Sequence, residues 1–186
     1  QITPQVLFLI FCLLILNSAT SADNGAVATA VPISGITVDG DLSDWPASLR
    51  QYPISYPERG DPPQSPEDLQ AGFYIAYNQE EQLPYVAVQV QDESIVLAHG
   101  KGDWCELFIA NAFWQEGEPR VLRFAQADDS TRTVAVPQDR YIVTQAAQYR
   151  AGTRQYEFAI QGDDLRVGDV LGFDLWMALL HKNIKC

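Results

Sequence analysis

The chain has 186 residues and carries 24 acidic side chains against 12 lysines and arginines, which gives a formal net charge of −12 at pH 7. Basic residues form no cluster in the sequence, and this argues against nucleic acid or an anionic membrane surface as a partner. The length suffices for one domain with a hydrophobic core.

An apolar run at residues 6–16 opens the chain and is too short to span a bilayer, which takes about 20 residues. Small residues follow it as far as Ala22, as they do at a signal-peptide cleavage site. We therefore expect an N-terminally incomplete signal peptide at 1–22, a tether at 23–34, and a secreted or periplasmic protein. A fragment of an uncleaved membrane anchor is the alternative.

The most informative stretch is residues 36–46, ITVDGDLSDWP. Three β-prone residues lead into Asp39-Gly40, a dipeptide that tolerates the positive φ of a tight turn. Trp45 then offers a large apolar side chain beside a proline that stops regular structure. The stretch predicts the first strand of a β domain, its turn, and an aromatic side chain that packs the loop onto the fold.

The same stretch holds three aspartates, Asp39, Asp41 and Asp44, at the density found in calcium-binding loops. Calcium takes oxygen ligands, so these residues are the candidates for a metal site. Their spacing does not match an EF-hand, and aspartate is also a common turn residue. Turn formation is therefore the favoured interpretation, with calcium as the alternative.

Beyond a proline-rich surface loop at 50–68, short β-prone segments recur, separated by turn residues, and no segment keeps a helical period. This spacing is typical of an all-β fold, an antiparallel β-sandwich. Residues 178–186 depart from the pattern and are set apart as a tail where the domain is cut short or the frame changes. The expected strands are 71–77, 84–91, 104–110, 121–127, 132–136, 141–149, 155–161 and 170–177.

Three cysteines are present, and one of them, Cys12, lies in the apolar run that would leave with the signal peptide. Cys105 lies in an apolar strand segment and Cys186 is the last residue. A disulfide between these two is one interpretation, since exported proteins meet an oxidising compartment. A buried free thiol at Cys105 is the favoured one.

Four segments occur in an order and spacing shared with a known group of domains: 36–45, 85–92, 103–109, and 156–160 followed by 168–175. This order resembles the family 9 carbohydrate-binding modules and the wider group of DOMON-like domains. The resemblance covers residues 35–177. It implies an antiparallel β-sandwich of jelly-roll or immunoglobulin-like type.

The resemblance also implies a sugar site around the segment DWCELFI. In sugar-binding members a glutamate at the position of Glu106 hydrogen-bonds sugar hydroxyls, and Asp103 matches the preceding aspartate. Gly100 stands where those members carry a clamping tryptophan, and residues 178–180 lack the Asn-Asp pair of the second clamp region. Trp104 lies two residues before Glu106, so both side chains are expected on the same face of the strand.

A sugar site needs a flat aromatic surface for stacking and polar groups for the hydroxyls. Trp45 and Trp176 are expected to fill the core or its rim instead. The expected ligand-binding residues are Asp103, Trp104, Glu106, Trp114 and Arg123.

Catalysis is not expected, because the sequence has no nucleophile motif and only two histidines, His99 and His181. No cofactor is expected beyond the calcium alternative. Some DOMON-like domains bind b-type haem through a methionine with a histidine or lysine, and here Met177 with either histidine is the remote alternative.

The sequence therefore predicts a non-catalytic, extracytoplasmic carbohydrate-binding domain that recognises a saccharide or another small ligand. Such modules are normally joined to a glycoside hydrolase. The alternative is the extracytoplasmic sensor domain of a membrane signalling protein, such as a histidine kinase or a nucleotide cyclase.

Overall fold

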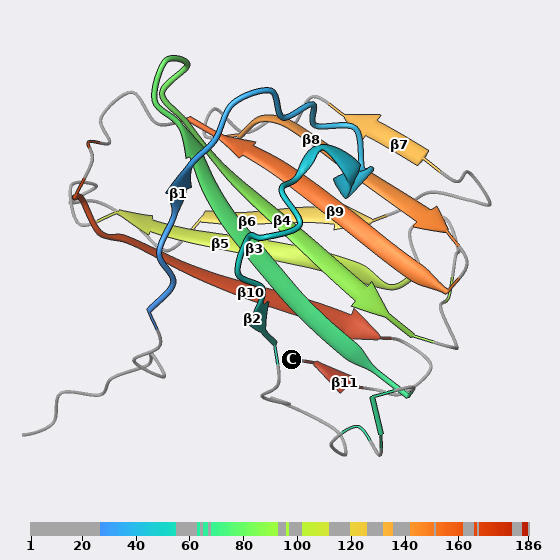
Figure 1. Ribbon diagram of the computed structural model, residues 1–186. Helices are drawn as coiled ribbons and strands as arrows, with labels where there is room; N and C mark the ends of the chain where they lie inside the picture. Colours follow the sequence, from blue (N-terminus) through green and yellow to red (C-terminus); the bar gives the residue numbers. More distant parts are fainter. Residues whose placement is uncertain are drawn as a thin grey trace, which may run out of the picture.

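The computed structural model describes strands and one short 3-10 helix (Figure 1). The part of the chain that the structure describes is all-β, as the period-two pattern predicts. The predicted signal peptide lies outside the described residues, and none of these belongs to a helix long and apolar enough to cross a membrane. The described residues are 27–54, 63, 65–66, 68–92, 96, 102–111, 120–125, 132–135, 142–150, 152–161, 166, 168–179 and 184–185.

The larger sheet has seven strands, six of them in the order β1-β3-β4-β9-β8-β7, with β2 also paired to β3. Neighbours are antiparallel, except that β1 runs parallel to β3. The bounds are β1 (Val31–Pro32), β2 (Tyr52–Pro53), β3 (Gln70–Asn78), β4 (Leu83–Gln91), β7 (Arg132–Ala135), β8 (Ile142–Arg150) and β9 (Thr153–Ile160).

The β3–β4 hairpin shows how local sequence sets the register of this sheet. Asn78 ends β3, and its side-chain oxygen accepts hydrogen bonds from the backbone N–H groups of Glu80 and Glu81 at 3.0 and 3.2 Å. Asparagine favours this kind of turn because its short side chain replaces a backbone acceptor. The turn lies at the predicted position, and the two flanking strands pair along nine residues each.

The smaller sheet has four antiparallel strands in the order β11-β10-β5-β6. Strand β10 runs past the predicted end at residue 177, and β11 lies in the 178–186 stretch predicted to depart from the strand pattern. The bounds are β5 (Trp104–Asn111), β6 (Arg120–Ala125), β10 (Leu171–Leu179) and β11 (Ile184–Lys185).

One hydrophobic core draws side chains from both sheets. Alternate residues of β5, β9 and β10 point into it, as period-two alternation requires. Cys105 lies in this core with its thiol free and fully buried, as favoured from the sequence, and burial raises its pKa. Cys186 lies outside the described residues. The central members are Val86, Val88, Cys105, Leu107, Ile109, Tyr156, Phe158, Ile160, Leu175 and Met177.

A second apolar cluster lies on the opposite face of the larger sheet, under the chain that links β1 to β2. Figure 1 shows this linking segment crossing in front of the large sheet. Trp45 is 7 % exposed there, and its ring lies 6.1 Å from that of Tyr74. The predicted role of Trp45 as the residue that packs the loop onto the fold is confirmed.

The prediction of a first strand at residues 36–38 is wrong, because β1 lies at Val31–Pro32, within the predicted tether. Ile36 and Val38 instead pack their side chains on the second apolar cluster. Between them, the N–H of Thr37 donates to the Asp44 carboxylate at 2.7 Å. The Asp44 side chain thus accepts the hydrogen bond that a neighbouring strand would otherwise accept from Thr37.

Candidate functional site

The outer face of the smaller sheet carries two of the predicted ligand-binding residues side by side. Along β5, Cys105 and Leu107 are fully buried in the core, so Trp104 and Glu106 point to the other side of the sheet. Trp104 is half-buried, and Phe108 continues the same face. The predicted Trp–Glu pair on one strand face is therefore present.

The neighbouring strand β10 adds an aromatic residue that the sequence prediction assigned to the core or its rim. Trp176 is paired in register with Glu106, and Asp174 with Phe108. The rings of Trp176 and Phe108 lie 5.1 Å apart at an angle of 50°, and the indole Nε1 of Trp176 donates to Asp174 at 3.1 Å. Trp176 is half-buried on this outer face, so it does not belong to the core between the sheets.

Alternation along β10 was the signal for this placement. Leu175 and Met177 on either side of Trp176 are 6 % and 1 % exposed and belong to the core. A strand with both flanking side chains in the core must send Trp176 to the other face. The sequence alternation separates Trp176 from Leu175 and Met177, but it does not show which of the two faces of β10 packs in the core.

Glu106 lies at the centre of the outer face. It is 6 % exposed, its backbone is paired with Trp176 on one side and with Arg123 on the other, and Trp104 and Phe108 flank it along the strand. A carboxylate in this setting has lost most of its water and is held among aromatic neighbours.

Two further predicted residues add little here. Trp114 lies outside the described residues, and only the backbone of Arg123 is described.

We name the outer surface formed by Trp104, Glu106, Phe108, Asp174 and Trp176 the aromatic–acidic face.

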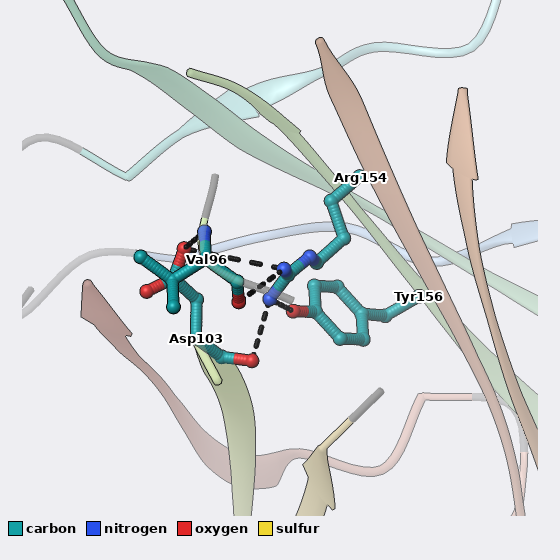
Figure 2. A network of polar contacts seen from close by, with 4 residues as sticks. All are labelled: Val96, Asp103, Arg154 and Tyr156. Carbon is teal, nitrogen blue, oxygen red and sulfur yellow. Dashed lines mark hydrogen bonds and ion pairs between the residues drawn. The ribbon is translucent and has the colours of Figure 1, made fainter. Parts of the chain in front are cut away.

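Asp103, the remaining predicted ligand residue, points into the protein (Figure 2). It is 2 % exposed, and its carboxylate accepts a hydrogen bond from the N–H of Val96 at 2.9 Å and lies 4.0 Å from the guanidinium of Arg154. Its N–H donates to the Val96 carbonyl at 3.0 Å. The structure therefore separates Asp103 from Trp104 and Glu106.

Arg154 of β9 is the centre of this buried polar network, and it is not among the predicted site residues. Its Nη1 donates to the Asp103 carbonyl at 2.5 Å and to the Tyr156 hydroxyl at 3.0 Å, and its Nη2 donates to the Val96 carbonyl at 3.2 Å. The side chain is 2 % exposed. Arg154 shares a strand face with Tyr156, Phe158 and Ile160. Alternation was therefore the signal that could have placed it on the core side, but it lies one residue before the predicted strand at 155–161.

The three calcium candidates each accept a hydrogen bond from the backbone of their own loop. Asp39 accepts from the N–H of Asp41 at 2.9 Å, Asp41 from that of Ser43 at 3.1 Å, and Asp44 from that of Thr37. Asp41 is the N-cap of the 3-10 helix η1 (Leu42–Asp44). Among the described residues no group of three or more potential ligands suits a metal ion. These contacts support the turn interpretation.

The Asp39-Gly40 turn is held by a carboxylate 117 residues away from Gly40 in the sequence. Glu157 of β9 is fully buried, and it accepts hydrogen bonds from the N–H groups of Asp39 at 2.9 Å and Gly40 at 2.5 Å and from the indole Nε1 of Trp45 at 2.7 Å. Burial raises the pKa of Glu157 to about 7, and the three donors oppose that rise.

Comparisons of the chain with protein-family models, with curated proteins and with solved structures found no match.

Proposed function

We propose that the domain is a non-catalytic, extracytoplasmic carbohydrate-binding β-sandwich of the jelly-roll or immunoglobulin-like, DOMON-like type. Its ligand surface is the aromatic–acidic face. The single observation that supports this most is the placement of two half-buried tryptophans, Trp104 and Trp176, beside the carboxylate of Glu106.

The chemistry of the face suits a saccharide. Sugar rings present flat C–H surfaces that stack on indoles, and hydroxyl groups that donate to carboxylates. Trp104 is paired with Ala178 and Trp176 with Glu106, so the two tryptophans are diagonal neighbours on adjacent strands. Diagonal side chains are about 7–8 Å apart, within reach of one another for aromatic residues. The face therefore offers aromatic rings beside two carboxylates, those of Glu106 and Asp174.

The proposal is tested by titrating the purified protein with a panel of soluble oligosaccharides and following tryptophan fluorescence and the heat of binding. Trp176→Ala and Trp104→Ala are each expected to weaken binding about tenfold or more, as central aromatic contacts commonly do. Glu106→Gln keeps the shape and removes the charge, and it is expected to weaken binding as well.

Val170→Ala is the matched control, since Val170 is 83 % exposed and lies just before β10. It is expected to bind like the unaltered protein. Absence of binding to every saccharide, or binding unchanged in both tryptophan variants, would contradict the proposal. A carbohydrate-binding module and a ligand-sensing domain of a signalling protein both require this face, and the experiment tests that common element.

A further inference from the structure

The buried network around Arg154 lies directly behind the first residue of the aromatic–acidic face. The guanidinium joins Val96 and Asp103, which are brought together by two more hydrogen bonds between themselves (Figure 2). Asp103 is followed at once by Trp104, where β5 begins. Arg154 therefore binds the main-chain carbonyl of Asp103, the residue from which the chain enters β5.

We propose that Arg154 is a positioning residue for ligand binding: it fixes the entry of β5 and thereby the orientation of Trp104. This inference rests on the proposed function of the aromatic–acidic face. Arg154 itself is 2 % exposed and belongs to the other sheet, so it acts through Asp103 and does not contact the ligand.

The geometry requires an arginine. The planar guanidinium donates to three acceptors, the carbonyls of Asp103 and Val96 and the Tyr156 hydroxyl, and lies at ion-pair distance, 4.0 Å, from the Asp103 carboxylate. A lysine ammonium is a point charge with a different set of directions and cannot make the same fork. Burial raises the pKa of the Tyr156 phenol, which keeps the hydroxyl neutral as an acceptor for Nη1.

The coupling to the face is graded along the strand. Trp104 is one peptide away from the held carbonyl, whereas Glu106 is two residues farther along the strand; both are paired on both sides within the sheet. Trp176 lies on β10 and has no covalent connection to the held segment nearby. A change at Arg154 is therefore expected to disturb Trp104 strongly, Glu106 less and Trp176 least.

Arg154→Lys is the test variant, because it keeps a buried cation and removes the fork. Glu157→Gln is the matched control: it is an equally conservative change, on the same strand, at a buried charge that faces the other side of the sheet. Both variants are made in the full chain, and their folding is checked by circular dichroism and thermal unfolding.

The first readout needs no ligand. Indole N–H signals of the four tryptophans are recorded by ¹H–¹⁵N NMR and assigned by single Trp→Phe replacements. Arg154→Lys is expected to shift the Trp104 signal and leave that of Trp45 unchanged, while Glu157→Gln is expected to do the reverse, since Trp45 bonds Glu157. An unmoved Trp104 signal in Arg154→Lys, or an equal shift in both variants, would overturn the inference.

The second readout is affinity for the saccharide that the unaltered protein binds best. Arg154→Lys is expected to lose about tenfold in affinity, and Glu157→Gln to lose none. Equal losses in both variants would show a general effect of stability and overturn the positioning role. If the unaltered protein binds no saccharide, the proposed function fails, while the NMR comparison still decides whether Arg154 positions Trp104.

If Arg154→Lys does not fold, Tyr156→Phe takes its place. This variant removes only the hydroxyl that accepts from Nη1 at 3.0 Å and keeps the ring that packs in the core. A shift of the Trp104 signal relative to the unaltered protein is expected while that of Trp45 stays in place, and an unmoved Trp104 signal would overturn the inference.

Discussion

Two buried ionisable side chains three residues apart on β9, Arg154 and Glu157, face opposite sides of the same sheet. Both hydrogen-bond a distant segment of the chain, Arg154 as a donor and Glu157 as an acceptor. Arg154 points into the core between the sheets and donates to the carbonyls of two residues that precede β5, Val96 and Asp103. Glu157 points to the outer face and accepts from the N–H groups of the 39–40 turn and from Trp45. Each connects β9 to a segment far away in the sequence.

The difference between the two lies in how each charge is balanced. Arg154 lies at ion-pair distance, 4.0 Å, from the carboxylate of Asp103, whereas the described partners of Glu157 are neutral N–H groups. A neutral donor set stabilises a carboxylate less than an opposite charge would, and this is why burial raises the pKa of Glu157 to about 7. We therefore expect the outer connection to respond to pH and the core connection to depend on an ion pair.

The largest effect is expected from Arg154→Met, which removes the guanidinium beside the buried carboxylate of Asp103. Breaking a buried ion pair on one side costs about 3–5 kcal/mol. Urea unfolding is the measurement. A double-mutant cycle with Asp103→Leu sharpens it: removal of both charges is expected to cost less than the sum of the single changes. Additive costs would contradict a direct pair.

The pH dependence of Glu157 separates the two connections. Because the folded pKa of about 7 is above the ordinary value of 4.5, the folded state binds the proton more tightly than the unfolded state. The free energy of unfolding therefore falls as pH rises from about 4.5 to about 7, by about 3 kcal/mol at most at 1.36 kcal/mol per unit.

The check is the difference in unfolding free energy between the unaltered protein and Glu157→Gln across that range. The variant carries no titrating group at this position, so its curve is expected to lack this fall. Parallel curves for the two proteins would show that Glu157 does not titrate there. Arg154→Lys is expected to keep the fall, because Glu157 is intact in it.

A smaller effect is expected from Gly40→Ala, which tests how closely the turn lies on the sheet. Gly40 has a φ of 86°, and a Cβ there would lie 2.7 Å from the carbonyl carbon of Ala147. Backbone strain and the clash together are expected to cost about 2 kcal/mol or more. Gly35→Ala is the matched control, with a φ of 81° and open space around it.

Gly35→Ala carries the strain without the clash, so it is expected to cost about 1 kcal/mol. Thermal unfolding of both variants is the measurement. Equal costs at the two glycines would mean that the turn can lift away from β8, and that the contact with Glu157 does not hold it in place.

Period-two alternation in the sequence predicts most of the strands, because side-chain direction in a strand is a local property. It also places Trp104 and Glu106 on one face and Cys105 in the core, since all three lie in one strand. The Asp39-Gly40 turn and the burial of Trp45 follow from local turn chemistry and from the size of an indole. These features depend on neighbours within a few residues.

The tertiary structure alone decided the surroundings of those residues. Arg154 and Glu157 are charged residues of an alternating strand, and their burial depends on segments 51 and 118 residues away. Trp176 and Glu106 become neighbours only through the pairing of β10 with β5. A local pattern determines which way a side chain points, but only long-range pairing determines what covers it.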